Sequence, residues 1–175
     1  MIVRPAELVD LKACLEMDHS YVTDHVWQME ETERGGEITV TFRTARLPRS
    51  MRVRYPKDYD NLLQDWRRGE CFLVAEEDGD IRGYLDMSVH SWNLTGWISH
   101  LTVAKSFRRQ GIGTALITKA IAWARQRGLT RVMLELQTKN YPAICFCQKN
   151  GFAFCGFNDR YYTNQDIALF FARSI

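Results

Sequence analysis

Two periods of hydrophobic and polar residues follow one another along this chain, and each predicts a different type of element. Alternation with a period of two is typical of strands with one buried face, and it predicts strands within residues 1–5, 35–47, 70–91, 95–104, 130–137, 152–159 and 166–174. The turn sequence EEDGD divides residues 70–91 into two strands. Spacings of three and four residues, together with helix stop signals, predict helices within 6–22, 24–31, 57–69, 106–128 and 141–151. This order predicts a mixed α/β sheet with a central crossover helix.

Two of these predicted helices have a definable buried face. In the helix within 106–128 the apolar positions are Leu116, Ile117, Ala120, Ile121 and Ala124, and Gly128 marks its end. In the helix within 6–22 the corresponding positions are Leu8, Leu11, Leu15 and Val22.

Composition narrows the class of protein. A chain of 175 residues with 46% hydrophobic and 25% charged residues predicts one globular domain covering 1–175. We expect no membrane partner, because no apolar run approaches the roughly 20 residues needed to span a bilayer. A net charge of +2 is too small to indicate a nucleic-acid partner.

The cysteines and the N-terminus indicate the compartment. The first residues, MIVRPAELVDL, lack a signal-peptide pattern, and five cysteines form no regular disulfide framework. We therefore expect free thiols and a cytoplasmic location. Cys145 and Cys147 form a C-x-C pair, but no second cysteine and histidine cluster completes a metal site, so no metal is predicted.

A glycine-rich turn, RRQGIGTA, precedes the helix within 106–128. Gly111 and Gly113 let the backbone approach a ligand closely, and the first amides of a helix form a ready anion site. Arg108 and Arg109 add forked donors suited to phosphate. The alternative is an ordinary loop with solvated arginines. A Walker motif is excluded because no Gly-Lys-Ser/Thr follows, and a dinucleotide fingerprint is excluded because its third glycine would fall at Leu116.

Two segments together resemble a known family. VAKSFRRQGIG is similar to the coenzyme A signature of the GNAT acetyltransferase superfamily, and NYPAICFCQKNGF is similar to its second signature. The segments TDHVWQM, SWN, NYPAI and CGFND further resemble the streptothricin acetyltransferase branch. LELQTKN and RYYTNQDIALFFARSI are also similar to the enzymes that acetylate the N-terminal amine of a ribosomal protein.

The resemblance implies a fold and a cosubstrate. It implies a mixed, mostly antiparallel sheet of about seven strands, with a V-shaped split between the fourth and fifth strands that holds acetyl-CoA. The residues that it assigns to acetyl-CoA are Leu101, Val103, Arg108, Arg109, Gln110, Gly111, Ile112, Gly113, Thr114, Asn140 and Ala143. It implies no metal, and it leaves a homodimer open.

Glu135 is the candidate base for acetyl transfer to an amine. It lies in RVMLELQ, where it points away from the apolar face, and a carboxylate in so apolar a strand needs a partner or a cavity. It also matches the proposed base of the ribosomal-protein branch; the alternative is a salt-bridged glutamate on a sheet face. Thr102 stands where many relatives carry their acid. His100, on the same face, is either a base acting through water or a structural histidine.

The general acid is the clearest departure from the family pattern. Cys147 occupies the position of the usual tyrosine; it is either an acid for the departing thiolate or a small buried residue. Tyr161 or Tyr162 are the alternative hydroxyls, and the coenzyme A thiolate is also a tolerable leaving group without any acid.

The acceptor is the least determined part of the sequence. The resemblance assigns acceptor contacts to Trp27, Trp92 and Asn93, and acidic residues near the expected helix 24–31 would attract a cation or simply form a solvated face. Three functions stay open: acetylation of a small-molecule amine such as a streptothricin-like antibiotic or a polyamine, acetylation of a peptide or protein N-terminus, and acyl-CoA binding without catalysis.

Overall fold

The computed structural model describes residues 1–56 and 61–175 of the chain. Its strands are β1 (Ile2–Pro5), β2 (Tyr21–Arg34), β3 (Glu37–Val53), β4 (Cys71–Glu77), β5 (Asp80–His90), β6 (Thr95–Val103), β7 (Arg131–Gln137), β8 (Ala153–Asn158) and β9 (Ala168–Ser174). Its helices are α1 (Asp10–Glu16), α2 (Leu62–Arg67), α3 (Ile112–Gln126) and α4 (Tyr141–Lys149), with short 3₁₀ turns η1 (Ser91–Asn93) and η2 (Lys105–Phe107). Among the described residues, no helix has the length and apolar character needed to cross a membrane.

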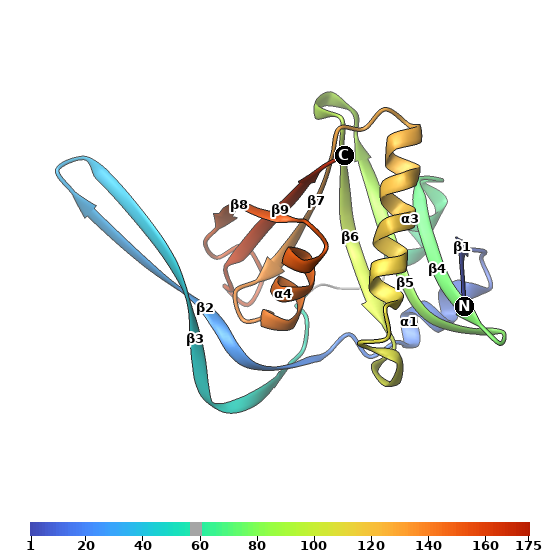
Figure 1. Cartoon of the computed structure of the whole chain (residues 1–175), viewed down its shortest axis with the longest axis horizontal. Helices are drawn as coiled ribbons and strands as arrows, with labels where there is room; N and C mark the ends of the chain where they lie inside the picture. Colours follow the sequence, from blue (N-terminus) through green and yellow to red (C-terminus); the bar gives the residue numbers. More distant parts are fainter. Residues whose placement is uncertain (57–60) are drawn as a thin grey trace.

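The main sheet confirms the predicted fold class. Within the described residues it has seven strands in the order β1-β4-β5-β6-β7-β9-β8. Neighbouring strands are antiparallel except for β6 and β7, whose parallel register runs from Thr95↔Arg131 to Ile98↔Leu134. Beyond that point β6 continues to Val103 and β7 to Gln137, and among the described residues the two strands no longer pair with each other. These are the fourth and fifth strands of the sheet in chain order, so the split lies where the resemblance implies it (Figure 1).

Helices cover both faces of the sheet. The larger hydrophobic cluster joins one face to α3 and α4, and includes Leu85, Leu116, Leu134 and Ile144. A smaller cluster joins the opposite face to α1 and α2. Successive residues of a strand point to opposite faces, so each cluster takes alternate positions of β4 and β5.

Helix α3 matches its prediction closely. Its five predicted core positions are all buried, namely Leu116, Ile117, Ala120, Ile121 and Ala124. The helix starts after Gly111, at φ 86°, and the chain turns away at Gly128, at φ 72°. Both are left-handed conformations that favour glycine.

The helix expected over residues 24–31 is wrong. These residues belong to β2, which pairs with β3 from Tyr21↔Val53 to Arg34↔Glu37 and forms a hairpin that extends beyond the main sheet (Figure 1). The two-residue turn is Gly35-Gly36, with φ 59° and 83°, a conformation that joins antiparallel strands without strain. This Gly-Gly pair, flanked by alternating residues, overrides the weak helical spacing.

Two other helices are shorter than predicted. The helix expected over 6–22 is reduced to α1, because the chain leaves the helix before His19 and enters β2 at Tyr21. Of its four predicted core positions, Leu11 is buried, whereas Leu8, Leu15 and Val22 are exposed. The helix expected over 57–69 becomes α2, and residues 57–60 of that prediction lie outside the described residues.

Candidate active site

A cleft of about 470 Å³ lies at the split between β6 and β7. This volume is in the range of small-molecule and cofactor sites. The wall on the α3 and α4 side includes Val103, Arg109, Gly111, Gly113, Ala143 and Phe146. The opposite wall includes His19, Tyr21, Tyr55, His100 and Glu135.

A β-bulge at Ser99 opens the cleft. In the pairing of β5 with β6, Asp86 faces His100 while Met87 faces Ile98, so Ser99 is an extra residue in β6. A bulge bends its strand and interrupts pairing. It follows directly on Ile98, the last residue of β6 paired with β7. The local backbone of β6 therefore accounts for the split.

The start of α3 borders the cleft and is built as an anion site. The first amides of a helix have no carbonyl partners within it and lie at the positive end of the helix dipole. Gly111 to Thr114 line the cleft together with Arg109. Arg109 itself has φ 66°, a left-handed conformation uncommon for a residue with a side chain. The chemistry of these donors fits a diphosphate.

Arg108 lines the cleft, and its guanidinium is bonded to three main-chain carbonyls. Its Nε donates to the carbonyl oxygen of Val103 at 2.9 Å. Its two terminal nitrogens donate to the carbonyl oxygens of Ser20 and Asp18, both at 2.7 Å. The guanidinium thus joins the end of β6 to the segment before β2, which carries two residues of the opposite cleft wall.

Asn140 fixes the start of α4 on the other border of the cleft. Its Oδ1 accepts from the amide of Ala143 at 3.3 Å, as an N-cap residue does. Pro142 occupies the first turn of the helix, where its missing N–H costs nothing. Asn140 and Ala143 both line the cleft, as expected of groups near the coenzyme arm.

Glu135 lies buried in the cleft wall, with 4% of its surface exposed. Its neighbours Leu134 and Leu136 pack in the cluster under α3 and α4, so Glu135 points to the opposite face of the sheet. The Tyr55 hydroxyl lies 3.4 Å from the Glu135 carbonyl oxygen and 3.3 Å from the Tyr162 hydroxyl. A carboxylate is therefore held among tyrosines on the side of the cleft away from α3.

The two candidate acids are placed differently. Cys147 lines the cleft but is 1% exposed and packs in the main core, and this burial raises the pKa of its thiol to about 12. A thiol with so high a pKa is a weaker acid than an ordinary thiol, so it is poorly suited to protonate the departing thiolate. Tyr162 is buried behind Tyr55 and outside the cleft lining, and burial raises the pKa of its hydroxyl. Tyr55, which the sequence did not single out, is the hydroxyl of this pair that reaches the cleft.

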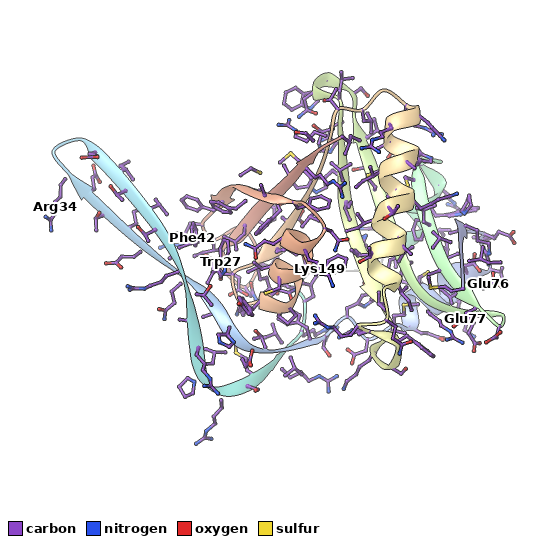
Figure 2. The ribbon with its side chains drawn as sticks, in the orientation of Figure 1. Trp27, Arg34, Phe42, Glu76, Glu77 and Lys149 are labelled. Carbon is purple, nitrogen blue, oxygen red and sulfur yellow. The ribbon has the colours of Figure 1, made fainter. Side chains whose placement is uncertain are left out.

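The three residues assigned to the acceptor lie away from the cleft lining. Trp27 packs against Phe42 of the hairpin and against Phe154 and Phe171 of β8 and β9, beside the main sheet (Figure 2). Trp92 is 85% exposed in η1. Asn93 follows it and precedes the part of β6 that pairs with β7, so it lies at the end of β6 away from the split. Gln110 is also outside the lining, with its side chain bonded to the Ser106 carbonyl.

Residues that flank the hairpin line the wall of the cleft that contains Glu135. Tyr21 begins β2 and Tyr55 follows the end of β3. The Tyr21 hydroxyl donates to Oε1 of Gln137 at 2.8 Å, and the amide of Trp27 donates to the Thr138 carbonyl at 2.8 Å. The hairpin is thereby attached to the end of β7. Recognising the Gly-Gly hairpin from the sequence would have brought both tyrosines to this place.

Comparison with known proteins decides the family. The profile of the acetyltransferase (GNAT) family matches residues 40–152. The chain belongs to the GNAT acetyltransferase family. It is 31% identical over 164 residues to a streptothricin acetyltransferase of Streptomyces lavendulae, covering 91% of this chain and 85% of the relative. It is 36% identical over 128 residues to streptothricin acetyltransferase A of Bacillus subtilis, covering 67% of this chain and 74% of the relative.

Solved structures agree with this GNAT assignment. A nourseothricin acetyltransferase has a TM-score of 0.83 at 27% identity, covering 99% of this chain and 97% of the other. A Bacillus anthracis protein solved in complex with acetyl coenzyme A has a TM-score of 0.82 at 24% identity, covering 99% and 98%. The second likeness shows the fold alone.

This GNAT protein is an N-acetyltransferase that uses acetyl-CoA. Acetyl-CoA supplies the activated acetyl group as a thioester. The residues present fit it: α3 offers amides for the diphosphate, and the main chain of β6 beyond Ile98 is not paired with β7 among the described residues. That edge of β6 suits an extended arm carrying amides.

Proposed function

We propose that this GNAT enzyme transfers the acetyl group to a primary amine of a small cationic molecule, such as a streptothricin-like antibiotic or a polyamine. The observation that carries the proposal is the buried carboxylate of Glu135 in the cleft wall opposite α3. A carboxylate there attracts an ammonium group, and burial strengthens the attraction because water screens it less. The relatives named streptothricin acetyltransferase support the choice of acceptor.

In this proposal Glu135 prepares the acceptor for attack. A lysine-type amine has a pKa of about 10.4 and is mostly protonated at neutral pH, so it must lose a proton before its nitrogen can form a bond. Glu135 pairs with the ammonium and takes that proton, directly or through water. Tyr21 and Tyr55 flank the acceptor position.

A peptide or protein N-terminus is the second candidate acceptor. An N-alpha-acetyltransferase of Sulfurisphaera tokodaii is 31% identical over 166 residues, covering 83% of this chain and 98% of the relative. The carboxylate of Glu135 can pair with the amine of a peptide N-terminus as well as with that of a small polyamine. The choice between them therefore requires a direct test.

The test is an acceptor screen that measures release of the coenzyme A thiol. The panel contains streptothricin, spermidine and peptides with free N-termini, each with acetyl-CoA and the purified chain. We expect turnover with the small polycationic amines. Turnover with peptides alone would overturn the small-molecule proposal, and stabilisation by acetyl-CoA without turnover of any amine would support the third function, binding without catalysis.

We also propose that the reaction takes place in the cytoplasm. All five cysteines are free, at positions 14, 71, 145, 147 and 155, as expected in a reducing compartment. Labelling of intact and permeabilised cells with a membrane-impermeant thiol reagent tests this, because Cys155 is exposed. Labelling of Cys155 in intact cells would contradict it.

A further inference from the structure

His100 is a second ionisable group in the same wall of the cleft. It lies on β6 just after the bulge and faces Asp86 across the strand pair. Its side chain is 8% exposed, and it lines the cleft. Tyr84, two residues before Asp86 on β5, packs in the cluster under α1 and α2, so His100 points to the same face of the sheet as Glu135.

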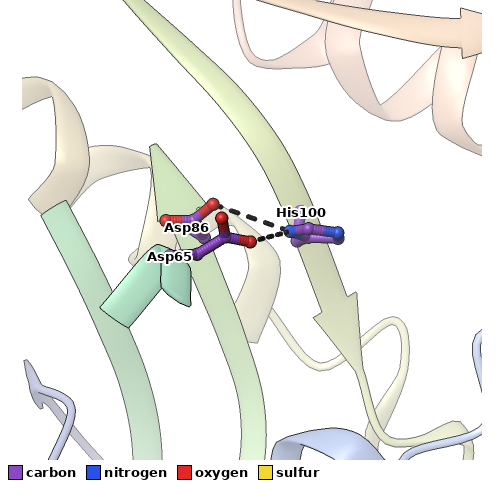
Figure 3. A group of neighbouring side chains, drawn as sticks. All are labelled: Asp65, Asp86 and His100. Carbon is purple, nitrogen blue, oxygen red and sulfur yellow. Dashed lines mark ion pairs between the residues drawn. The ribbon is translucent and has the colours of Figure 1, made fainter. Parts of the chain in front are cut away.

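Two carboxylates face one nitrogen of the His100 ring. Nδ1 lies 3.6 Å from Oδ2 of Asp86 and 3.8 Å from Oδ2 of Asp65, which comes from α2 (Figure 3). The other ring nitrogen points away from both carboxylates (Figure 3). Carboxylates on one side of an imidazole favour the tautomer with its proton on that side, and they stabilise the imidazolium. Nε2 is then the nitrogen that accepts a proton.

The guanidinium of Arg68 pairs with the two carboxylates that face His100. Arg68 donates to Oδ1 of Asp65 at 2.7 Å and lies 3.3 Å from Oδ2 of Asp86 and 3.2 Å from Oε2 of Glu70. Asp65, Asp86 and His100 offer three ligand atoms within 4.8 Å of one another, and both carboxylates are also paired with the Arg68 guanidinium. Asp65 and Asp86 face Nδ1 of His100, so they can stabilise the charge that the ring gains when it accepts a proton.

Tyr84, His19 and Glu135 also lie near His100 or in the same wall of the cleft. The Tyr84 ring is 6.4 Å from the His100 ring, and the Tyr84 hydroxyl is 2.8 Å from Nε2 of His19. Burial, and then the neighbouring His100, lower the pKa of His19 to about 4, so His19 is neutral at physiological pH. Glu135 is the carboxylate on β7 in the same cleft wall.

We propose that His100, oriented by Asp86 and Asp65, takes the proton that the acceptor nitrogen loses as its bond to the acetyl carbon forms. This rests on the proposed function, in which Glu135 takes the first proton from the ammonium. The nitrogen lone pair forms the new bond, the carbon–sulfur bond breaks, and coenzyme A leaves as a thiolate. The second proton passes to Nε2, directly or through water, and then to the thiolate or to solvent. Two protons thus leave the nitrogen. Glu135 on β7 takes the first, and His100 on β6 takes the second.

The test removes the His100 imidazole by mutation and then supplies free imidazole in solution. His100→Ala should lower kcat about a hundredfold, the scale of general acid–base catalysis, and leave the Kd for acetyl-CoA within about twofold. Added imidazoles of graded pKa should restore turnover, with the rate rising with the pKa of the base. Asp86→Asn should lower kcat as well, without removing the ring. His90→Gln is the matched control, since His90 stacks on Trp97 at the other end of β5.

Each outcome decides the role of His100. Turnover of His100→Ala within about threefold of wild type overturns it, as does a loss that no imidazole restores in a variant that binds acetyl-CoA normally. The assay uses whichever amine the wild-type chain acetylates. Acetylation of peptides alone would therefore reject the small-molecule proposal while the rescue experiment still decides the role of His100.

Discussion

The ring of Phe146 lies against the position where Gly113 would carry a side chain. A Cβ atom on Gly113 would be 3.1 Å from Cζ and 3.2 Å from Cε2 of that ring. Gly113 is in the first turn of α3 and Phe146 is in α4, so this contact sets how closely the two borders of the acetyl-CoA cleft approach each other. The second glycine of the coenzyme A signature thus leaves room for the Phe146 ring at this border of the cleft.

The first prediction concerns Gly113→Ala. The added methyl group forces the Phe146 ring aside, and overpacking of this kind costs about 1–3 kcal/mol. We expect a lower free energy of unfolding in urea and a weaker Kd for acetyl-CoA by calorimetry, because the α3 amides move relative to α4. Lys119→Ala, exposed on the same helix, is the control and should change neither. An unchanged Kd in Gly113→Ala would reject the link between this contact and the cleft.

Glu135→Gln tests the first proton transfer. The amide has nearly the shape of the carboxylate but cannot pair with an ammonium or take its proton. We expect kcat to fall about a hundredfold or more, while the Kd for acetyl-CoA stays within about twofold. Glu31→Gln, exposed on the hairpin, controls for loss of one negative charge. Equal turnover in Glu135→Gln and wild type would remove Glu135 from the proposal.

Local signals allowed the sequence to predict the cosubstrate side of the site. The apolar face of α3, its glycine start and stop, and the Asn-x-x-Ala start of α4 are each encoded within a few neighbouring residues. The acceptor side depends on long-range contacts. Tyr21 and Tyr55 meet near the cleft only because a hairpin returns the chain there, and Asp65 and Asp86 meet His100 only in the folded sheet. Position along the chain does not reveal such contacts.

Arg108 illustrates the same limit within a recognised motif. Its place in the signature predicts a contact with the coenzyme, which stays a prediction, whereas the structure adds three main-chain carbonyls that its guanidinium holds. Two of these acceptors, Asp18 and Ser20, are far from it in sequence, so no local pattern could predict them. A motif identifies which residue is present and leaves its partners to the fold.

Cys147→Ala tests whether this thiol protonates the departing coenzyme A thiolate. Burial raises the pKa of this thiol to about 12, so it is poorly suited to protonate the coenzyme A thiolate. We expect turnover to remain within about tenfold of wild type, with stability lowered by about 1–2 kcal/mol as a small cavity forms. Cys155→Ala, at the exposed cysteine, should change neither quantity. A loss of turnover above about a hundredfold would restore Cys147 as the general acid.

His19 gives a prediction for stability against pH. Burial first, and then the neighbouring His100, lower the pKa of His19 from 6.5 to about 4 in the folded chain. The unfolded chain therefore binds this proton at a higher pH than the folded chain does, and protonation favours unfolding. The stability that neutral His19 contributes is complete above pH 6.5 and is lost as the pH falls through the window down to about 4.

The variant His19→Gln isolates this contribution, because glutamine does not titrate and can still bond to the Tyr84 hydroxyl. We expect its free energy of unfolding in urea to fall less steeply than that of wild type between pH 6.5 and about 4. Carboxylates shared by both proteins contribute equally, so the difference between the curves reports His19. His90→Gln should follow wild type in this comparison. Parallel curves for wild type and His19→Gln would mean that His19 takes up its proton equally in the folded and unfolded chains.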